Sequence, residues 1–174
     1  QWIVRVAMIT LATDARSGRW VRYTPDPDSS ELSREALIAA AERIADRLET
    51  KAIRGGEEAT WLGLGFVGEH WVLAPLGTDL YGGLLGVALF LAQLGALTGR
   101  QKYRDLGERA MCTWIRKERD AGASADAIGG YGGLGAVVYG LARLARLWGR
   151  ADLLDLARRR LALFEPLIAS DEIF

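Results

Sequence analysis

The sequence has few of the residues that metal-binding or disulfide-bonded domains need. Its 174 residues include one cysteine, Cys112, and one histidine, His70. A single cysteine excludes an internal disulfide and fits a reducing, cytoplasmic location. Lysine plus arginine and aspartate plus glutamate both number 22, so the net charge is near zero. Nothing therefore indicates nucleic-acid binding, for which a clustered basic face is expected.

The chain also lacks targeting signals. Its start, Gln1–Arg5, has no basic region followed by a long apolar run, so no signal peptide is predicted. A first residue other than methionine suggests a piece of a longer protein. The uncharged stretch Leu80–Gly99 is long enough to span a bilayer, but a second copy of it carries Arg143 and Arg146, which are costly at bilayer depth. We expect a buried helix and no membrane span.

A repeat with an offset of fifty residues is the strongest organisational signal. Residues 81–109 align with residues 131–159 without a gap, and fourteen of the twenty-nine aligned positions are identical. Each copy opens with Tyr-Gly-Gly-Leu, at Tyr81 and at Tyr131. This pattern indicates two copies of one structural unit.

Each copy is predicted to be a helical hairpin. An apolar helix spans 84–98 in the first copy and 134–148 in the second. A glycine follows each helix and is expected to end it in the left-handed conformation. An amphipathic helix comes next, over 101–118 and 151–169. The first helix of each pair is expected to be inner and the second outer, with Arg158-Arg159-Arg160 on the solvated side.

Glycine clusters stand where the inner helices begin. Because glycine has no side chain, the clusters are expected to let backbones approach closely. A nucleotide-binding GxGxxG loop would have to follow a strand within a βαβ unit. Residues 119–128 before the second cluster are polar and alanine-rich, and a turn at Pro75 precedes the first, so nucleotide binding is not expected. The clusters comprise Gly82, Gly83, Gly86, Gly129, Gly130, Gly132, Gly133 and Gly135.

The region before the repeat has a different pattern. Residues 25–30 form a turn-rich linker, and a helix is predicted over 31–49. Gly55-Gly56 is predicted to interrupt the secondary structure. Residues 61–67 and 71–73 are predicted to be two short strands. The apolar face of the helix comprises Leu37, Ile38, Ala41, Ile44, Ala45 and Leu48.

Three single residues are candidates for function. Cys112 is expected to pack as a small hydrophobe, since a nucleophilic cysteine needs a histidine partner. His70 is expected to have a structural or surface role. Asp79 precedes the first inner helix, where a carboxylate can cap the free N–H groups. A catalytic zinc site needs three protein ligands, so one Cys and one His cannot form one, and no metal or cofactor is expected to bind this chain.

Several segments resemble the start of the cyclase domain of LanM-type (class II) lanthipeptide synthetases. Residues 61–64 are similar to the family pattern W-L-G-L. Residues 75–91 are similar to P-L-G-x-D-L-Y-D-G-L-S-G-I-A-L-F-L. The sequence departs from this pattern at Gly82 and Leu85, where the family has Asp and Ser. Residues 129–148 resemble the next glycine-led inner helix.

The resemblance implies a domain organisation and a fold. Residues 1–24 correspond to the tail of a preceding dehydratase-like region, 25–58 to a linker and helix, and 59–174 to the first part of a LanC-like cyclase domain. The implied fold class is all-α, a partial α/α toroid with about two helical hairpins. A helix and a short β-hairpin precede these, and part of the inner-helix surface should be exposed because two hairpins cannot close a ring.

The resemblance also implies an activity on a precursor peptide with a leader sequence. A dehydratase part would dehydrate Ser and Thr with ATP and magnesium. The cyclase would then form lanthionine rings by Michael addition of Cys, with zinc holding the thiolate. Asp79 matches the family's aspartate beside the zinc and is the candidate catalytic residue. The family's zinc ligands, in C-H-G and W-C-x-G motifs, are absent here, so the chain is expected to be an inactive fragment.

Two other function classes remain open. An α/α-toroid enzyme acting on carbohydrate would need a carboxylate pair, for which Asp79 and Asp126 are the candidates. A non-catalytic helical-repeat binding module would have repeats of about 34 to 47 residues without a glycine-rich start.

Overall fold

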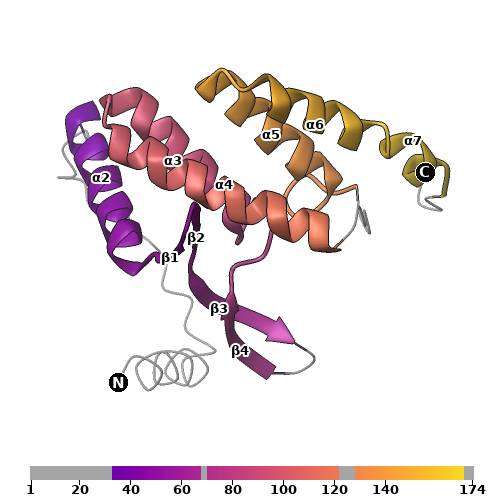
Figure 1. The fold of residues 1–174 in the computed structure, drawn as a ribbon, viewed down its shortest axis with the longest axis horizontal. Helices are drawn as coiled ribbons and strands as arrows, with labels where there is room; N and C mark the ends of the chain where they lie inside the picture. Colours follow the sequence, from indigo (N-terminus) through magenta and orange to yellow (C-terminus); the bar gives the residue numbers. More distant parts are fainter. Residues whose placement is uncertain (1–32, 68–69, 122–127, 171–174) are drawn as a thin grey trace, which may run out of the picture. The chain divides into compact units, whose positions relative to one another are not determined.

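The computed structural model describes residues 33–67, 70–121 and 128–170, and the described residues from Arg34 onward belong to one compact unit. Predictions for the first thirty-two residues lie outside the described part. The elements in chain order (Figure 1) are α2 (Arg34–Lys51), β1 (Ile53–Gly55), β2 (Glu58–Thr60), β3 (Leu62–Val67), β4 (His70–Pro75), α3 (Leu84–Thr98), α4 (Gln101–Ala121), α5 (Leu134–Trp148), α6 (Ala151–Leu161) and α7 (Phe164–Ser170). The predominance of helices confirms the predicted all-α class.

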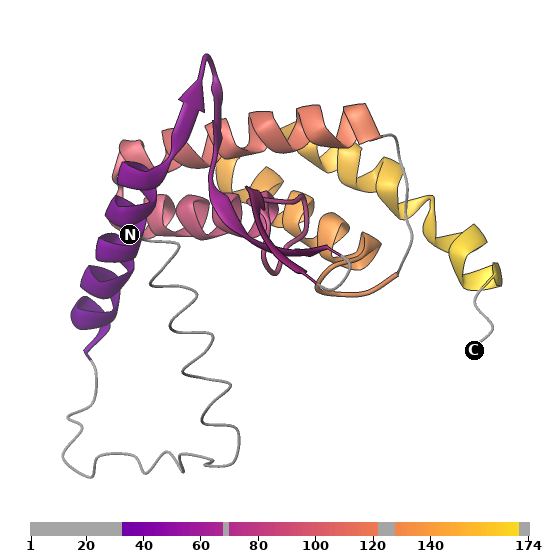
Figure 2. The same cartoon turned by 90° about the horizontal axis from the view of Figure 1, so that it is seen from below.

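The repeat forms two helical hairpins, as predicted. Helices α3 and α4 pack side by side, α5 packs on α6, and the inner helices α3 and α5 contact each other (Figures 1 and 2). Both inner helices have the predicted boundaries. Each ends at a glycine in the left-handed conformation, with φ of 70° at Gly99 and 68° at Gly149. The duplicated glycines therefore set the length of the inner helices.

Helix α3 lies at the centre of the hydrophobic core. Its leucines Leu84, Leu85 and Leu91 are fully buried. Burial of one such side chain contributes about 2 kcal/mol. From α4, the large side chains of Tyr103 and Trp114 are also fully buried against the core. Most of this apolar helix is thereby covered, which explains the uncharged stretch noted in the sequence, although Leu97 near its end is 60% exposed.

The outer helix predicted over 151–169 is broken. Helix α6 ends at Leu161, and α7 begins at Phe164. Proline in a helix interior lacks a donor N–H and its ring clashes with the carbonyl four residues earlier. Pro166 is tolerated only because it lies in the first turn of a new helix. The prediction of one continuous helix was wrong because it ignored this proline.

The predicted apolar face of α2 is only partly buried. Ala45 is fully buried, and Ala41 and Leu48 pack against the core. Leu37 and Ile44 are more than half exposed, at 54% and 57%. The 3.6-residue periodicity identifies a helix, but it does not determine how much of the apolar stripe a neighbour covers.

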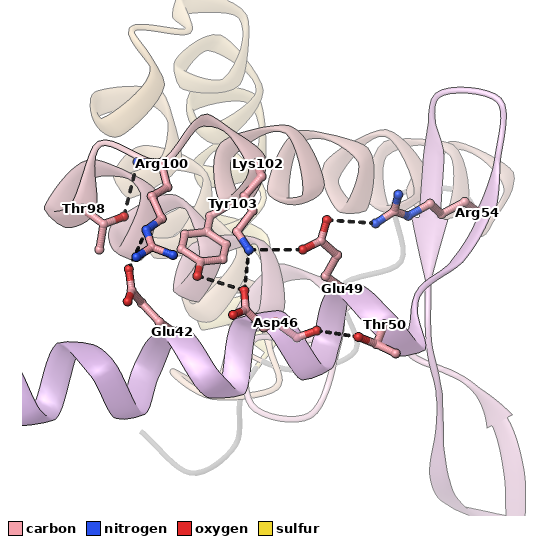
Figure 3. A network of polar contacts seen from close by, with 9 residues as sticks. All are labelled: Glu42, Asp46, Glu49, Thr50, Arg54, Thr98, Arg100, Lys102 and Tyr103. Carbon is pink, nitrogen blue, oxygen red and sulfur yellow. Dashed lines mark hydrogen bonds and ion pairs between the residues drawn. The ribbon is translucent and has the colours of Figure 1, made fainter.

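Polar contacts join α2 to the turn between α3 and α4 (Figure 3). Asp46 accepts hydrogen bonds from the Lys102 ammonium group at 2.6 Å and from the Tyr103 hydroxyl at 3.0 Å. Arg100 forms an ion pair with Glu42 at 2.9 Å. The Lys102 and Tyr103 contacts lower the pKa of Asp46. These contacts fix α2 on the first hairpin.

Two antiparallel β-hairpins precede α3. The predicted one pairs β3 with β4, from Leu62 opposite Pro75 to Val67 opposite His70. The other pairs β1 with β2 and was not predicted. Its two-residue turn contains Gly56 with φ of 55°. The predicted break in secondary structure at Gly55-Gly56 is therefore the turn of a β-hairpin. Since β3 and β4 are antiparallel, the first glycine cluster does not lie in a βαβ unit.

Inner-helix surface is partly exposed, as expected for two hairpins. On α5, the side chain of Tyr139 is 51% exposed, and Arg143 and Arg146 are also exposed. The two arginines therefore lie on the face of α5 that neither α3 nor α6 covers. None of the described helices is long and apolar enough to cross a membrane.

Candidate functional site

The segment 76–83, here called the entry loop, connects β4 to α3 and is fixed at both ends. The N–H of Leu76 donates to the carbonyl oxygen of Trp61 at 2.9 Å, and the N–H of Leu84 donates to Gly77 at 2.9 Å. The indole Nε1 of Trp114 donates to the carbonyl oxygen of Thr78 at 2.7 Å. Because Trp114 is fully buried, this bond holds the loop on the core.

Two glycines make the entry loop possible. A Cβ atom at Gly83 would lie 2.5 Å from the carbonyl oxygen of Asp79, and one at Gly86 would overlap the carbonyl oxygen of Leu80. Both contacts are with backbone, which cannot move aside easily. The expected close approach of backbones is therefore confirmed at these positions. It is not confirmed at Gly130 and Gly132, where an added Cβ would meet nothing within 4 Å.

Asp79 is half-buried in the entry loop and organises it. Its carboxylate Oδ1 accepts a hydrogen bond from the N–H of Gly82 at 2.6 Å. The N-cap residue of α3 is Gly83, and no side chain caps the helix. The prediction that Asp79 caps the N-terminus of α3 is therefore wrong. Its carboxylate instead binds the N–H of Gly82, one residue before the N-cap residue. Gly82 binds only one of the two carboxylate oxygens of Asp79.

The tyrosines that open the two repeats meet each other. The ring centroids of Tyr81 and Tyr131 are 6.4 Å apart with an interplanar angle of 86°, an edge-to-face contact. Both rings are nevertheless largely exposed, at 87% and 76%. The starts of the two inner helices are thus adjacent in space, and one ring of this aromatic pair, Tyr81, follows Asp79 by two residues.

Comparison with protein families agrees with this geometry. The model of the lanthionine synthetase C-like protein family matches residues 74–172, more than half of the chain. The chain belongs to the lanthionine synthetase C-like family. The match contains both helical hairpins and the entry loop. A comparison with individual curated proteins finds no match.

In this lanthionine synthetase C-like chain, Cys112 is not in the expected place. It is exposed on α4, whereas packing in the core was predicted. It lines a polar depression of about 410 Å³ together with Glu57, Arg109 and Arg150. Partial desolvation raises the pKa of the Cys112 thiol, although Arg150 opposes this rise. A raised pKa disfavours the thiolate, so Cys112 is a poor nucleophile.

The structure does not bring the candidate zinc ligands of this LanC-like chain into a cluster. His70 is exposed at the start of β4, and Cys112 lies on α4. Within the described ranges, no group of three or more His, Cys, Asp and Glu residues could hold a metal ion. The described residues therefore do not fit the zinc site that the resemblance to the cyclases implies. Asp126, the second carboxylate considered for a carbohydrate enzyme, lies outside the described residues.

Sequence reasoning missed the aromatic pair. The signal was present, since Tyr81 and Tyr131 are equivalent positions of the repeat. Repeat-equivalent residues at the starts of neighbouring parallel inner helices lie on the same side of a toroid, so their meeting could have been predicted.

Proposed function

We propose that the chain forms the first arc of the cyclase domain of a LanM-type (class II) lanthipeptide synthetase. The family assignment supports a function of the lanthionine-cyclase type. The finer proposal is a cytoplasmic, bifunctional enzyme whose partner is a precursor peptide with a leader sequence. The observation that carries it is the family match across both hairpins, with Asp79 held at the start of the first inner helix.

The proposed reaction joins a cysteine to a dehydrated residue of the same peptide. The cysteine sulfur, as thiolate, forms a bond to the β-carbon of dehydroalanine or dehydrobutyrine. The electron pair of the double bond moves towards the α-carbon, which then takes up a proton. In this proposal Asp79 moves a proton between the reacting peptide and water, using the oxygen that Gly82 does not bind.

The cofactors of the complete enzyme belong to the same proposal. Zinc is expected in the cyclase, and ATP with magnesium in the dehydratase part. Since the described residues of this chain do not fit a zinc site, we propose that the ligands come from other residues of the complete enzyme. The role assigned to Asp79 does not depend on where those ligands lie.

The proposal can be tested on the protein encoded by the complete reading frame that contains these residues. With precursor peptide, ATP and magnesium, we expect loss of one water per dehydrated residue and then loss of the free cysteine thiol, both followed by mass spectrometry. Dehydration that requires ATP supports the class II assignment. A protein that neither dehydrates nor cyclises the peptide would refute it.

The role of Asp79 can be separated from its structural contact. Asp79→Asn keeps an oxygen that can accept from the Gly82 N–H but cannot transfer the proton, so kcat for ring closure should fall by about 100-fold or more. Its thermal stability should match that of the wild type. Asp79→Ala removes both the contact and the chemistry and should also lower the stability. Full activity of the Asn variant would show that Asp79 only organises the loop.

A further inference from the structure

The aromatic pair is unusual because the repeat preserves it without burying it. The apolar identities of the repeat at Leu84, Leu91 and Leu94 are explained by burial in the core. Tyr81 and Tyr131 are identical between the copies but are the most exposed large hydrophobic residues described. Packing within the described structure therefore does not account for having an aromatic ring at both positions.

Open space flanks Tyr131 within the part of the chain that the structure describes. An added Cβ at Gly130 or Gly132 would meet no atom within 4 Å, so a ligand can approach the backbone on both sides of Tyr131. Of the residues that the structure describes, none accepts a hydrogen bond from the N–H of Gly130, Tyr131 or Gly132. Asp79 lies two residues before Tyr81, and one of its carboxylate oxygens accepts from the N–H of Gly82. A ligand with a peptide backbone and a flat group that can stack on the rings fits these features.

We propose that Tyr81 and Tyr131 form a contact site for the dehydrated segment of the peptide substrate. This inference rests on the proposed function. Dehydroalanine and dehydrobutyrine are neutral and planar, with a double bond conjugated to the peptide carbonyl. Flat, uncharged groups of this kind stack on aromatic faces, and exposed backbone N–H groups can pair with the carbonyls of the same peptide. One ring comes from each repeat, so the site exists only when both hairpins are present.

A binding measurement on the 174-residue chain tests this directly. The probes are two synthetic peptides that differ at one residue, dehydrobutyrine in one and saturated 2-aminobutyrate in the other, titrated by calorimetry. We expect the wild type to prefer the dehydrated peptide. The double variant Tyr81→Ala/Tyr131→Ala should bind it roughly tenfold more weakly and lose the preference. Tyr81→Phe/Tyr131→Phe keeps both rings and should retain the preference.

A matched control uses Tyr139, a half-exposed tyrosine of α5 outside the pair. Tyr139→Ala should leave the affinity for the dehydrated peptide unchanged. Circular dichroism should show the same helix content in all variants, since the replaced rings are exposed. Equal affinity of the wild type for both peptides would overturn the inference, and so would undiminished affinity in the double Ala variant.

Steady-state kinetics of the complete enzyme distinguish a failure of this contact site from a failure of the proposed function. If the wild type forms thioethers and the double Ala variant raises KM for the dehydrated peptide with kcat nearly constant, the contact site is supported. Thioether formation with an unchanged KM in that variant would overturn the contact site alone. A wild type that forms no thioether would instead overturn the proposed function.

Discussion

Thr113 on α4 offers a sharp test of how the first hairpin holds the β1–β2 hairpin. Its hydroxyl donates to the carbonyl oxygen of Ala59 at 2.9 Å and accepts from the Ala59 N–H at 3.1 Å. Ala59 is paired with Arg54 next to a two-residue turn, at a position where its backbone groups point away from the partner strand. The single hydroxyl of Thr113 thus satisfies both groups at the buried edge of β2.

Replacement by valine keeps the shape of Thr113 and removes both hydrogen bonds. Ala59 is 1% exposed and Thr113 is 2% exposed, so water cannot replace the lost hydroxyl. A buried polar group left unpaired costs about 1–3 kcal/mol, and the two groups together should cost about 3 kcal/mol of unfolding free energy. In a chain of this size such a loss lowers Tm by about 6–12 °C.

The matched control is Thr113→Ser, which keeps the hydroxyl and loses one methyl group. It should cost only about 1 kcal/mol. The unfolding free energies are measured by urea titration followed by circular dichroism. If Thr113→Val were as stable as Thr113→Ser, the hydroxyl would not be holding β2, and the assigned contact between α4 and the hairpin would be wrong.

Three further changes test other parts of the structure. Gly140→Ala places a Cβ 2.7 Å from a side-chain carbon of Leu85 on α3, so it should destabilise the fold by about 1–3 kcal/mol in urea unfolding, whereas Gly130→Ala, in open space, should have little effect. A large effect at Gly130 instead would contradict the packing described. Because its folded-state pKa lies below the ordinary value of 3.8, Asp46 stabilises the fold above that pH and loses this effect as the pH falls below it. Asp46→Asn should therefore lower Tm at pH 7 but not in strong acid; an equal difference at both pH values would count against the ion pair. Cys112 should react with Ellman's reagent at pH 7 more slowly than an unperturbed thiol, since its pKa is raised, and faster reaction would contradict this.

Much of the repeat region could be predicted because glycine marks its boundaries. The inner helices begin after Gly83 and Gly133 and end at Gly99 and Gly149, where a positive φ strongly favours glycine. The apolar pattern between these glycines then predicts that the first helix of each hairpin is the buried one. Fold class and inner-helix boundaries follow from these local rules alone.

Other features depend on tertiary contacts that the sequence does not reveal. Strand β2 has a single buried residue, Ala59, whose backbone groups bind Thr113, which is distant in sequence. Ile44 continues the apolar stripe of α2 but is 57% exposed, since none of the described elements covers that side. Cys112 was expected in the core, yet it lies beside the arginines of a polar depression. In each case the sequence pattern fits the local helix or strand, but the elements packed against it determine whether the side chain is buried.

The candidate site was predicted in part. Asp79 was selected by resemblance, and the structure shows which atom it binds, the N–H of Gly82. Its proposed catalytic role stays a prediction. The aromatic pair was not predicted, although Tyr81 and Tyr131 are equivalent positions of the repeat.

The proposal that this chain is one arc of a larger cyclase is tested by comparing two proteins, the product of the complete reading frame and the 174-residue chain. The measurement is ring closure. Both are given zinc and a dehydrated peptide with one free cysteine, and thioether formation is followed by mass spectrometry after thiol alkylation. We expect one tightly bound zinc and thioether product for the complete protein, and neither for the chain alone. Stoichiometric zinc binding or thioether formation by the 174-residue chain would contradict it.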